Sequence, residues 1–138
     1  MVDEFWFSRI ESIVFDTIKK KSAPYLEQYS PILFVDTALS ERPAQFPCIE
    51  ITELQGVERG QTLTNDEICA YLSTFQINVY AEDSKQSARD IMSEIISHFK
   101  KDLAFNIVAM PVYAHNGDIH RYSARVRRLI GAGDTIVI

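Results

Sequence analysis

The alternation of apolar and polar residues from Glu67 to Tyr80 restricts the fold more than any other feature of this chain. An alternation of this length is typical of a long β-strand. One face of that strand carries Cys69, Tyr71, Phe75, Ile77 and Val79, and the other carries Ala70, Leu72, Thr74, Gln76, Asn78 and Tyr80. A strand with one apolar and one mixed face predicts a sheet that is covered by helices on the apolar side.

Two segments have apolar residues at helical spacing. The first runs from Glu4 to Lys21, and Ser22 and Pro24 are expected to end it. The second follows Ser84, a good N-cap residue, and continues to about Asp102. Packing both helices on one face of a mostly antiparallel sheet is the most economical arrangement, so the sequence predicts an α+β fold.

The remaining pattern predicts further strands and their turns. Pro111 within one of these strands indicates a sheet edge or a bulge, because proline cannot donate to a strand ladder. The pair Asn116-Gly117 favours a tight type I′ hairpin. The stretch from Gln55 to Asp66 is polar and has no helical or strand pattern, so we interpret it as an extended hairpin loop. The predicted strands are 32–35, 48–54, 105–114 and 119–130.

Length and composition fit one globular domain over residues 1–138. Hydrophobic residues make up 46% of the chain and charged residues 24%, the usual balance for a folded protein. The net charge is -5, and the first 70 residues carry 12 acidic and 6 basic side chains. An acidic chain argues against a nucleic-acid-binding domain.

The sequence predicts a protein made in a cytoplasm. No apolar run approaches the roughly 20 residues that cross a bilayer, and the first residues are acidic where a signal peptide is basic. The two cysteines, Cys48 and Cys69, lie in predicted strands and are interpreted as free thiols, since a reducing cytoplasm disfavours disulfides.

No motif predicts enzymatic chemistry, a metal or a cofactor. The sequence has no phosphate-binding glycine loop, no metal-spaced cysteine pair and no strained serine elbow. His115, Asp118 and His120 flank the Asn-Gly turn and are possible metal ligands, but a fourth ligand is missing and polar residues at such a turn usually serve turn geometry and solvation. Glu50 and Glu53 have an odd spacing on a strand, so they face opposite sides and cannot pair as an acid and a base. We therefore expect no catalytic residues.

Four arginines crowd the last predicted strand, and they allow three interpretations. They can form a solvated sheet face, or they can bridge acidic side chains of a neighbouring subunit, because the guanidinium pairs with carboxylates in two bonds. The candidate acidic partners are Glu50, Glu53, Glu58, Asp66 and Glu67. Leu72 and Tyr80 are candidate contacts on the mixed strand face. A third interpretation places the arginines along a pore that DNA passes. The arginines are Arg121, Arg125, Arg127 and Arg128.

The layout resembles the tail terminator (tail completion) proteins of long-tailed bacteriophages and prophages. The resemblance covers nearly the whole chain and begins with an opening amphipathic helix. Its motifs are structural: Phe46-Pro-Cys-Ile-Glu-Ile as the first main strand, Phe75-Gln-Ile-Asn-Val-Tyr-Ala in the long strand, Ser84-Lys-Gln-Ser-Ala-Arg-Asp-Ile at a helix start, and Arg121-Tyr-Ser-Ala-Arg-Val-Arg in the last strand.

This resemblance implies a six-membered homo-oligomeric ring at the head-proximal end of the virion tail. Such a ring stops polymerisation of the tail tube protein and offers a surface to head-completion and neck proteins. Two loops become candidates for docking these partners, with no membrane or cofactor involved. The loop residues are Gln55, Gly56, Glu58, Arg59, Gly60, Asn65 and Asp66 in one loop and Asn116 and Gly117 in the other.

Two other classes of protein remain open at this point. One is another phage neck or tail component, such as a head–tail connector or stopper of similar size. The other is a small ligand-binding or enzymatic α+β domain, which predicts a deep apolar pocket with converging polar groups.

Overall fold

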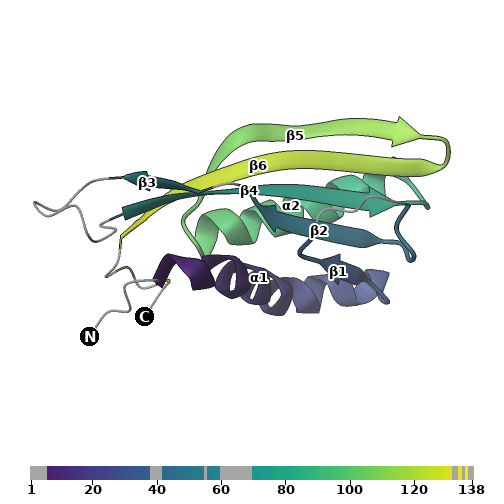
Figure 1. Ribbon diagram of the computed structural model, residues 1–138. Coiled ribbons are helices and arrows are strands. Elements are labelled where there is room, and N and C mark those ends of the chain that lie inside the picture. The colour runs from purple at the N-terminus through teal and green to yellow at the C-terminus, as the bar shows by residue number, and fades with distance from the viewer. Residues whose placement is uncertain are drawn as a thin grey trace, which may run out of the picture.

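The computed structural model describes residues 6–37, 42–54, 56–59, 70–131, 134 and 136, with the side chains of residues 6, 7 and 57–59 excepted. The helices are η1 (Trp6–Arg9), α1 (Ile10–Leu26), η2 (Glu27–Tyr29) and α2 (Lys85–Lys101). The strands are β1 (Leu33–Val35), β2 (Cys48–Glu53), β3 (Val57–Arg59), β4 (Ala70–Ala81), β5 (Asn106–Asn116) and β6 (Ile119–Gly131). In Figure 1, α2 lies behind the sheet and α1 runs below it.

The sheet follows the order β1-β2-β4-β6-β5. The short β3 pairs with the first residues of β4, and β2 pairs with the later ones. Among the described strands, β1 and β2 pair in parallel and all the other pairs are antiparallel. The predicted α+β fold, a mostly antiparallel sheet with two helices on one face, is therefore confirmed. The long β4 pairs with β6 along its whole length, from Ala70 opposite Gly131 to Ala81 opposite His120.

The core lies between the helices and one face of the sheet. On β4 the odd positions Phe75, Ile77 and Val79 are fully buried, as the alternation predicts. Helix α2 buries its apolar stripe against them. Three phenylalanine rings, from β4, from α2 and from the residue just before β5, pack with centroid distances of 5.3 to 5.9 Å. The rings belong to Phe75, Phe99 and Phe105.

Helix α1 ends later in the chain than predicted. We expected Ser22 and Pro24 to end it, but it continues through both residues to Leu26. The Ser22 hydroxyl is buried and donates to the carbonyl of Ile18 at 2.6 Å, so this polar residue is accommodated inside the helix. Pro24 lies within the last turn, where its missing N–H removes one bond to the preceding turn. Burial of Leu26 favours the extra turn.

Helix α2 begins and ends with identifiable local contacts. The Ser84 hydroxyl accepts a hydrogen bond from the Ser87 N–H at 3.1 Å, which confirms the predicted N-cap. At the other end, Ala104 has a left-handed φ of 58°, and the Phe105 N–H donates to the Phe99 carbonyl at 2.9 Å. This turn directs the chain from α2 into β5.

The stretch from Gln55 to Asp66 differs from the prediction of a loop without strand structure. Val57 to Arg59 form β3, which pairs with Leu72 to Ala70 of β4. A strand of three residues is too short to produce a visible alternation, and it forms here because β4 extends past the end of β2 and offers free backbone groups. Gly56 separates β2 from β3 at a close approach, since a Cβ on it would lie 1.9 Å from the Tyr71 ring.

The β5–β6 hairpin is as short as predicted but has a different turn. Asn116 pairs with Ile119, so the turn residues are Gly117 and Asp118, and of these only Gly117 has a positive φ, at 63°. A type I′ turn needs positive φ at both central residues, whereas glycine in the first position is typical of type II′. As predicted from Pro111, β5 is an edge strand, and its register shifts twice between Ile107 and Val112.

Candidate functional site

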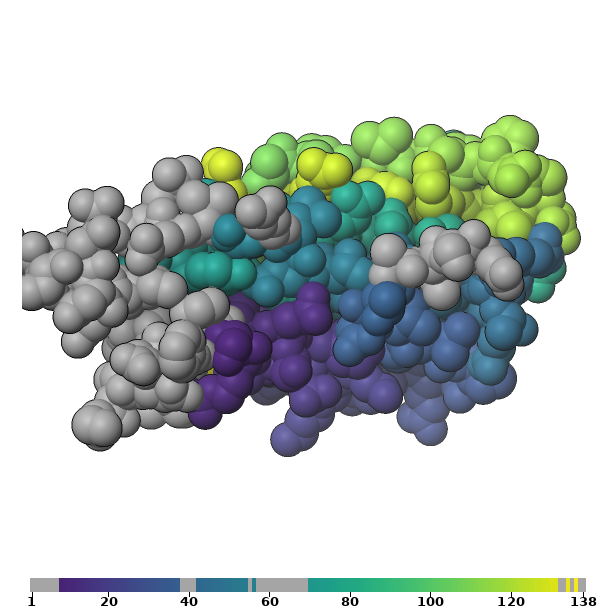
Figure 2. Space-filling view, viewed as in Figure 1, coloured from purple at the N-terminus to yellow at the C-terminus, as the bar shows by residue number. Residues whose placement is uncertain are grey.

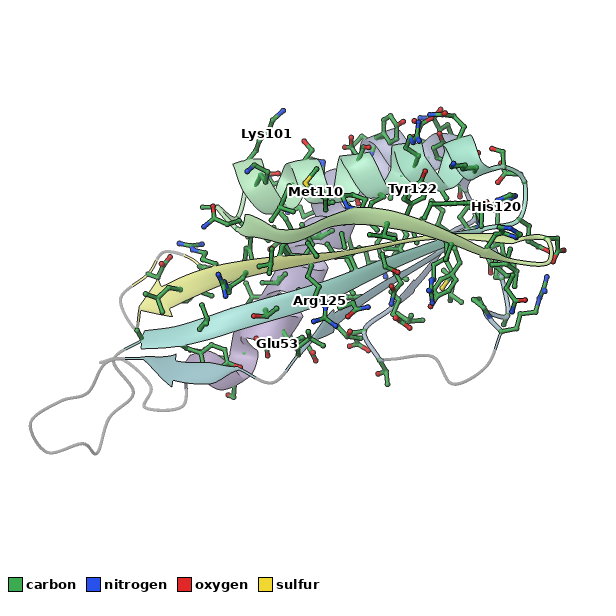
Figure 3. All side chains as sticks on the ribbon, turned by 90° about the horizontal axis from the view of Figure 1, so that it is seen from above. Glu53, Lys101, Met110, His120, Tyr122 and Arg125 are labelled. Atoms are coloured by element: carbon green, nitrogen blue, oxygen red, sulfur yellow. The ribbon has the colours of Figure 1, made fainter. Side chains whose placement is uncertain are left out.

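The sheet face opposite the helices carries a column of exposed arginines. Arg121, Arg125 and Arg127 occupy alternate positions of β6 and all three are exposed. Figure 3 shows Arg125 on the side of the sheet away from α2. The front view in Figure 2 shows β4, β6 and β5 side by side above α1. Among the described residues, none of these three arginines forms an ion pair, although the protein is acidic.

A polar network lies on the same face beside the arginines. The Asn78 amide donates to the Glu50 carboxylate and accepts a hydrogen bond from the Ser123 hydroxyl at 2.6 Å. Arg125 Nε donates to the Gln76 side-chain oxygen at 3.1 Å. Glu50 is only 4% exposed, so it is covered within its own subunit. These bonds fix the polar side chains between β2, β4 and β6.

Two predicted contact residues of β4 also lie on this face. Leu72 and Tyr80 are half-buried. Tyr80 hydrogen-bonds Arg121, and burial, followed by the charge of Glu50, raises its pKa. The neighbouring Cys48 thiol is buried, and desolvation raises its pKa to about 11, which disfavours the reactive thiolate.

Glu53 lies on the opposite, helix-facing side of the sheet, as its odd spacing from Glu50 predicts. Its carboxylate accepts a hydrogen bond from the Ser73 hydroxyl at 2.6 Å, and its N–H donates to the Glu11 carboxylate at 2.9 Å. Burial raises the pKa of Glu53, and the charge of Glu11 adds to this while the Ser73 bond opposes it. Tyr71 hydrogen-bonds Glu53, and its own pKa rises to about 12, first because of burial.

Arg128 is separated from the other three arginines. It also lies on the helix-facing side, where Nη2 contacts both carboxylate oxygens of Asp134 at 2.7 Å and Nη1 donates to the Leu103 carbonyl at 2.7 Å. Its side chain is 19% exposed. The sequence indicates this difference, because positions 127 and 128 of one strand face opposite sides.

The two candidate docking loops are described to different extents. Asn116 and Gly117 are exposed at the β5–β6 turn. Gly56 is half-buried beneath Tyr71, and Glu58 and Arg59 belong to the backbone of β3. Gln55, Gly60, Asn65 and Asp66 lie outside the described residues, as does Cys69.

The sequence interpretation missed an exposed apolar edge on β5. Val108, Met110 and Val112 are 48%, 67% and 64% exposed. Met110 extends towards the side of the sheet on which α2 lies (Figure 3). The signal is the unbroken apolar run from Ile107 to Tyr113 around a proline, because an edge strand with bulges does not keep the alternation of a regular strand.

No family model and no curated protein matches the sequence. Within the described part of the chain, no group of three or more histidine, cysteine, aspartate or glutamate side chains could hold a metal ion. The described helices also include none that is long and apolar enough to cross a membrane.

Proposed function

We propose that this protein forms a homo-oligomeric ring, six-membered by its resemblance, that caps the head-proximal end of a phage tail tube. The ring ends polymerisation of the tube and provides the surface to which head-completion proteins bind. The mechanism is steric: one side of the ring matches the tube, and the other side lacks the edge on which tube subunits add.

The observation that carries this proposal is the arginine column on the uncovered sheet face. Three arginines without ion pairs among the described residues favour a carboxylate partner from another chain, because arginine is enriched at protein interfaces. A closed ring requires two different complementary patches on each subunit, and an arginine face with an acidic front half of the chain meets that requirement. The exposed β5 edge adds apolar contact area.

The structure also restricts which acidic residues are available. Glu50 is bonded to Asn78 and covered, and Glu53 is on the helix-facing side. Neither is therefore a suitable partner for the arginines of a neighbouring subunit. Exposed acidic side chains such as Asp36 and Glu27 meet the requirement better.

The first experiment measures the mass of the purified protein by light scattering over a concentration series at low and high salt. We expect a hexamer, or a monomer that moves towards one with concentration, and weaker association at high salt because salt screens exposed charges. Arg127→Glu should weaken association, whereas Lys20→Glu, the same charge change on the exposed face of α1, should not.

A protein that stays monomeric at every concentration is then mixed with purified tail tubes. Binding to the tube end supports a ring that assembles only on the tube. Failure to bind tubes removes the proposal and favours a neck component, such as a connector or stopper, or a ligand-binding domain.

A further inference from the structure

A hollow of about 440 Å³ lies on the arginine face, where β5 turns into β6. Its volume is within the range of small-molecule sites. Three separate segments line it: the loop before β2, the end of β4 and the hairpin. The lining residues are Arg42, Pro43, Tyr80, Ala114, His115, Asn116, Ile119 and Arg121.

The two arginines of the hollow have different partners. Arg42 donates to Glu82 at 2.8 Å and contacts Asp118 at 3.5 Å, so it joins the β4–α2 loop to the hairpin. Arg121 bonds the Tyr80 hydroxyl, and no described carboxylate forms an ion pair with it. A guanidinium has five N–H donors in a planar fork, and Arg121 therefore keeps donors for an added acceptor.

The charges around the hollow select the kind of anion. Glu82 and Asp118 both pair with Arg42 at the rim, so with Arg121 the four charges sum to zero, and Arg121 is the one of the four without a described carboxylate partner. A polyanion such as a phosphate chain would also meet repulsion from these two carboxylates. The apolar part of the wall consists of Pro43, Ala114 and Ile119. A single carboxylate on a short apolar body fits both the charge and the lining.

We propose that this hollow binds a small monocarboxylic acid, with Arg121 pairing the carboxylate through two N–H bonds and Pro43 and Ile119 contacting the apolar body. Asn116 and Tyr80 add polar groups to the lining of the hollow. The site shares Arg121 with the proposed subunit contact but needs neither the ring nor the tail to form, so it is tested on the monomer and can fail separately from the proposed function.

The test is a titration of the full chain with sodium hexanoate, in which the amide chemical shifts are measured by two-dimensional NMR at each concentration. We expect saturable shifts confined to the hairpin and the loop before β2. Arg121→Gln should weaken binding at least ten-fold, which corresponds to about 1.4 kcal/mol. Arg127→Gln removes another exposed arginine of the same strand that does not line the hollow, and it should leave the affinity for hexanoate unchanged.

Hexanol and hexylamine test the role of the carboxylate and should produce no saturable shifts. The proposal is overturned if Arg121→Gln binds hexanoate as tightly as the parent protein, or if hexanol binds as well as hexanoate. It is also overturned if no shift occurs up to about 20 mM hexanoate, well above the Kd of about 1 mM of a weak site. If the same signals shift with protein concentration alone, a carboxylate of a second copy occupies the hollow and the small-acid assignment is wrong.

Discussion

Replacing Arg128 by glutamine should cost far more stability than the same change at Arg127, its neighbour in the chain. Arg128 makes a two-oxygen contact with Asp134 and a bond to the Leu103 carbonyl, all at 2.7 Å. Removing one partner of a buried ion pair costs about 3–5 kcal/mol. Because both side chains are 19% exposed, water compensates in part, and we expect a loss of about 2–3 kcal/mol.

The expected loss is measured by urea unfolding and by thermal unfolding. For a chain of 138 residues, a loss near 2.5 kcal/mol lowers Tm by about 9 °C. Arg127→Gln should change stability by less than about 0.5 kcal/mol, as surface substitutions usually do. In a double-mutant cycle, Arg128→Gln with Asp134→Asn should cost less than the sum of the single changes. Equal effects of the substitutions at 127 and 128 would refute the assignment of Arg128 as a structural residue.

Two further predictions concern a carboxylate and a backbone conformation. The raised pKa of Glu53 means that its protonated form is favoured in the folded state, so the stability from this group is present below the unfolded pKa and is lost as pH rises through the folded pKa. Glu53→Gln should therefore be more stable than the parent protein at pH 7, and urea unfolding at pH 7 and pH 4 should show that this gain in stability is smaller at pH 4. The control is Glu27→Gln, which changes an exposed carboxylate. A gain that is larger at pH 4 would contradict the reasoning. Ala104→Gly should stabilise the protein by about 0.5–1 kcal/mol in the same assay, because Ala104 has a left-handed φ that glycine adopts without strain; a loss of stability would show that Ala104 is not strained.

The fold was predictable where the periodicity is long. Alternation in β4 identified its buried face, and the same parity placed Glu50 and Glu53 on opposite sides. Short or tertiary features were not predictable. The strand β3 has three residues and depends on the exposed backbone of β4, and α1 passes Pro24 because Leu26 is buried in the core.

The candidate site shows the same division. Arg121, Arg125 and Arg127 share one face because a strand alternates, and this can be read from the sequence. Glu50 carries no local mark of being covered, since its burial comes from contacts made by distant segments. The hollow likewise joins Arg42 to the hairpin across 76 positions of sequence. A contact between residues so far apart in the chain leaves no trace in the spacing of apolar and polar residues.

The full-length pairing of β4 with β6 has a consequence for folding kinetics. The β5–β6 hairpin is local, since Asn116 pairs with Ile119, whereas β4 and β6 join Ala81 to His120 and Ala70 to Gly131. Closing such distant pairs costs loop entropy before any contact is gained. We expect the hairpin and α2 to form within microseconds and the central ladder to limit the rate, so that folding takes roughly milliseconds to seconds. Substitutions in the β4–β6 ladder should consequently slow folding, while those in α1 should mainly accelerate unfolding.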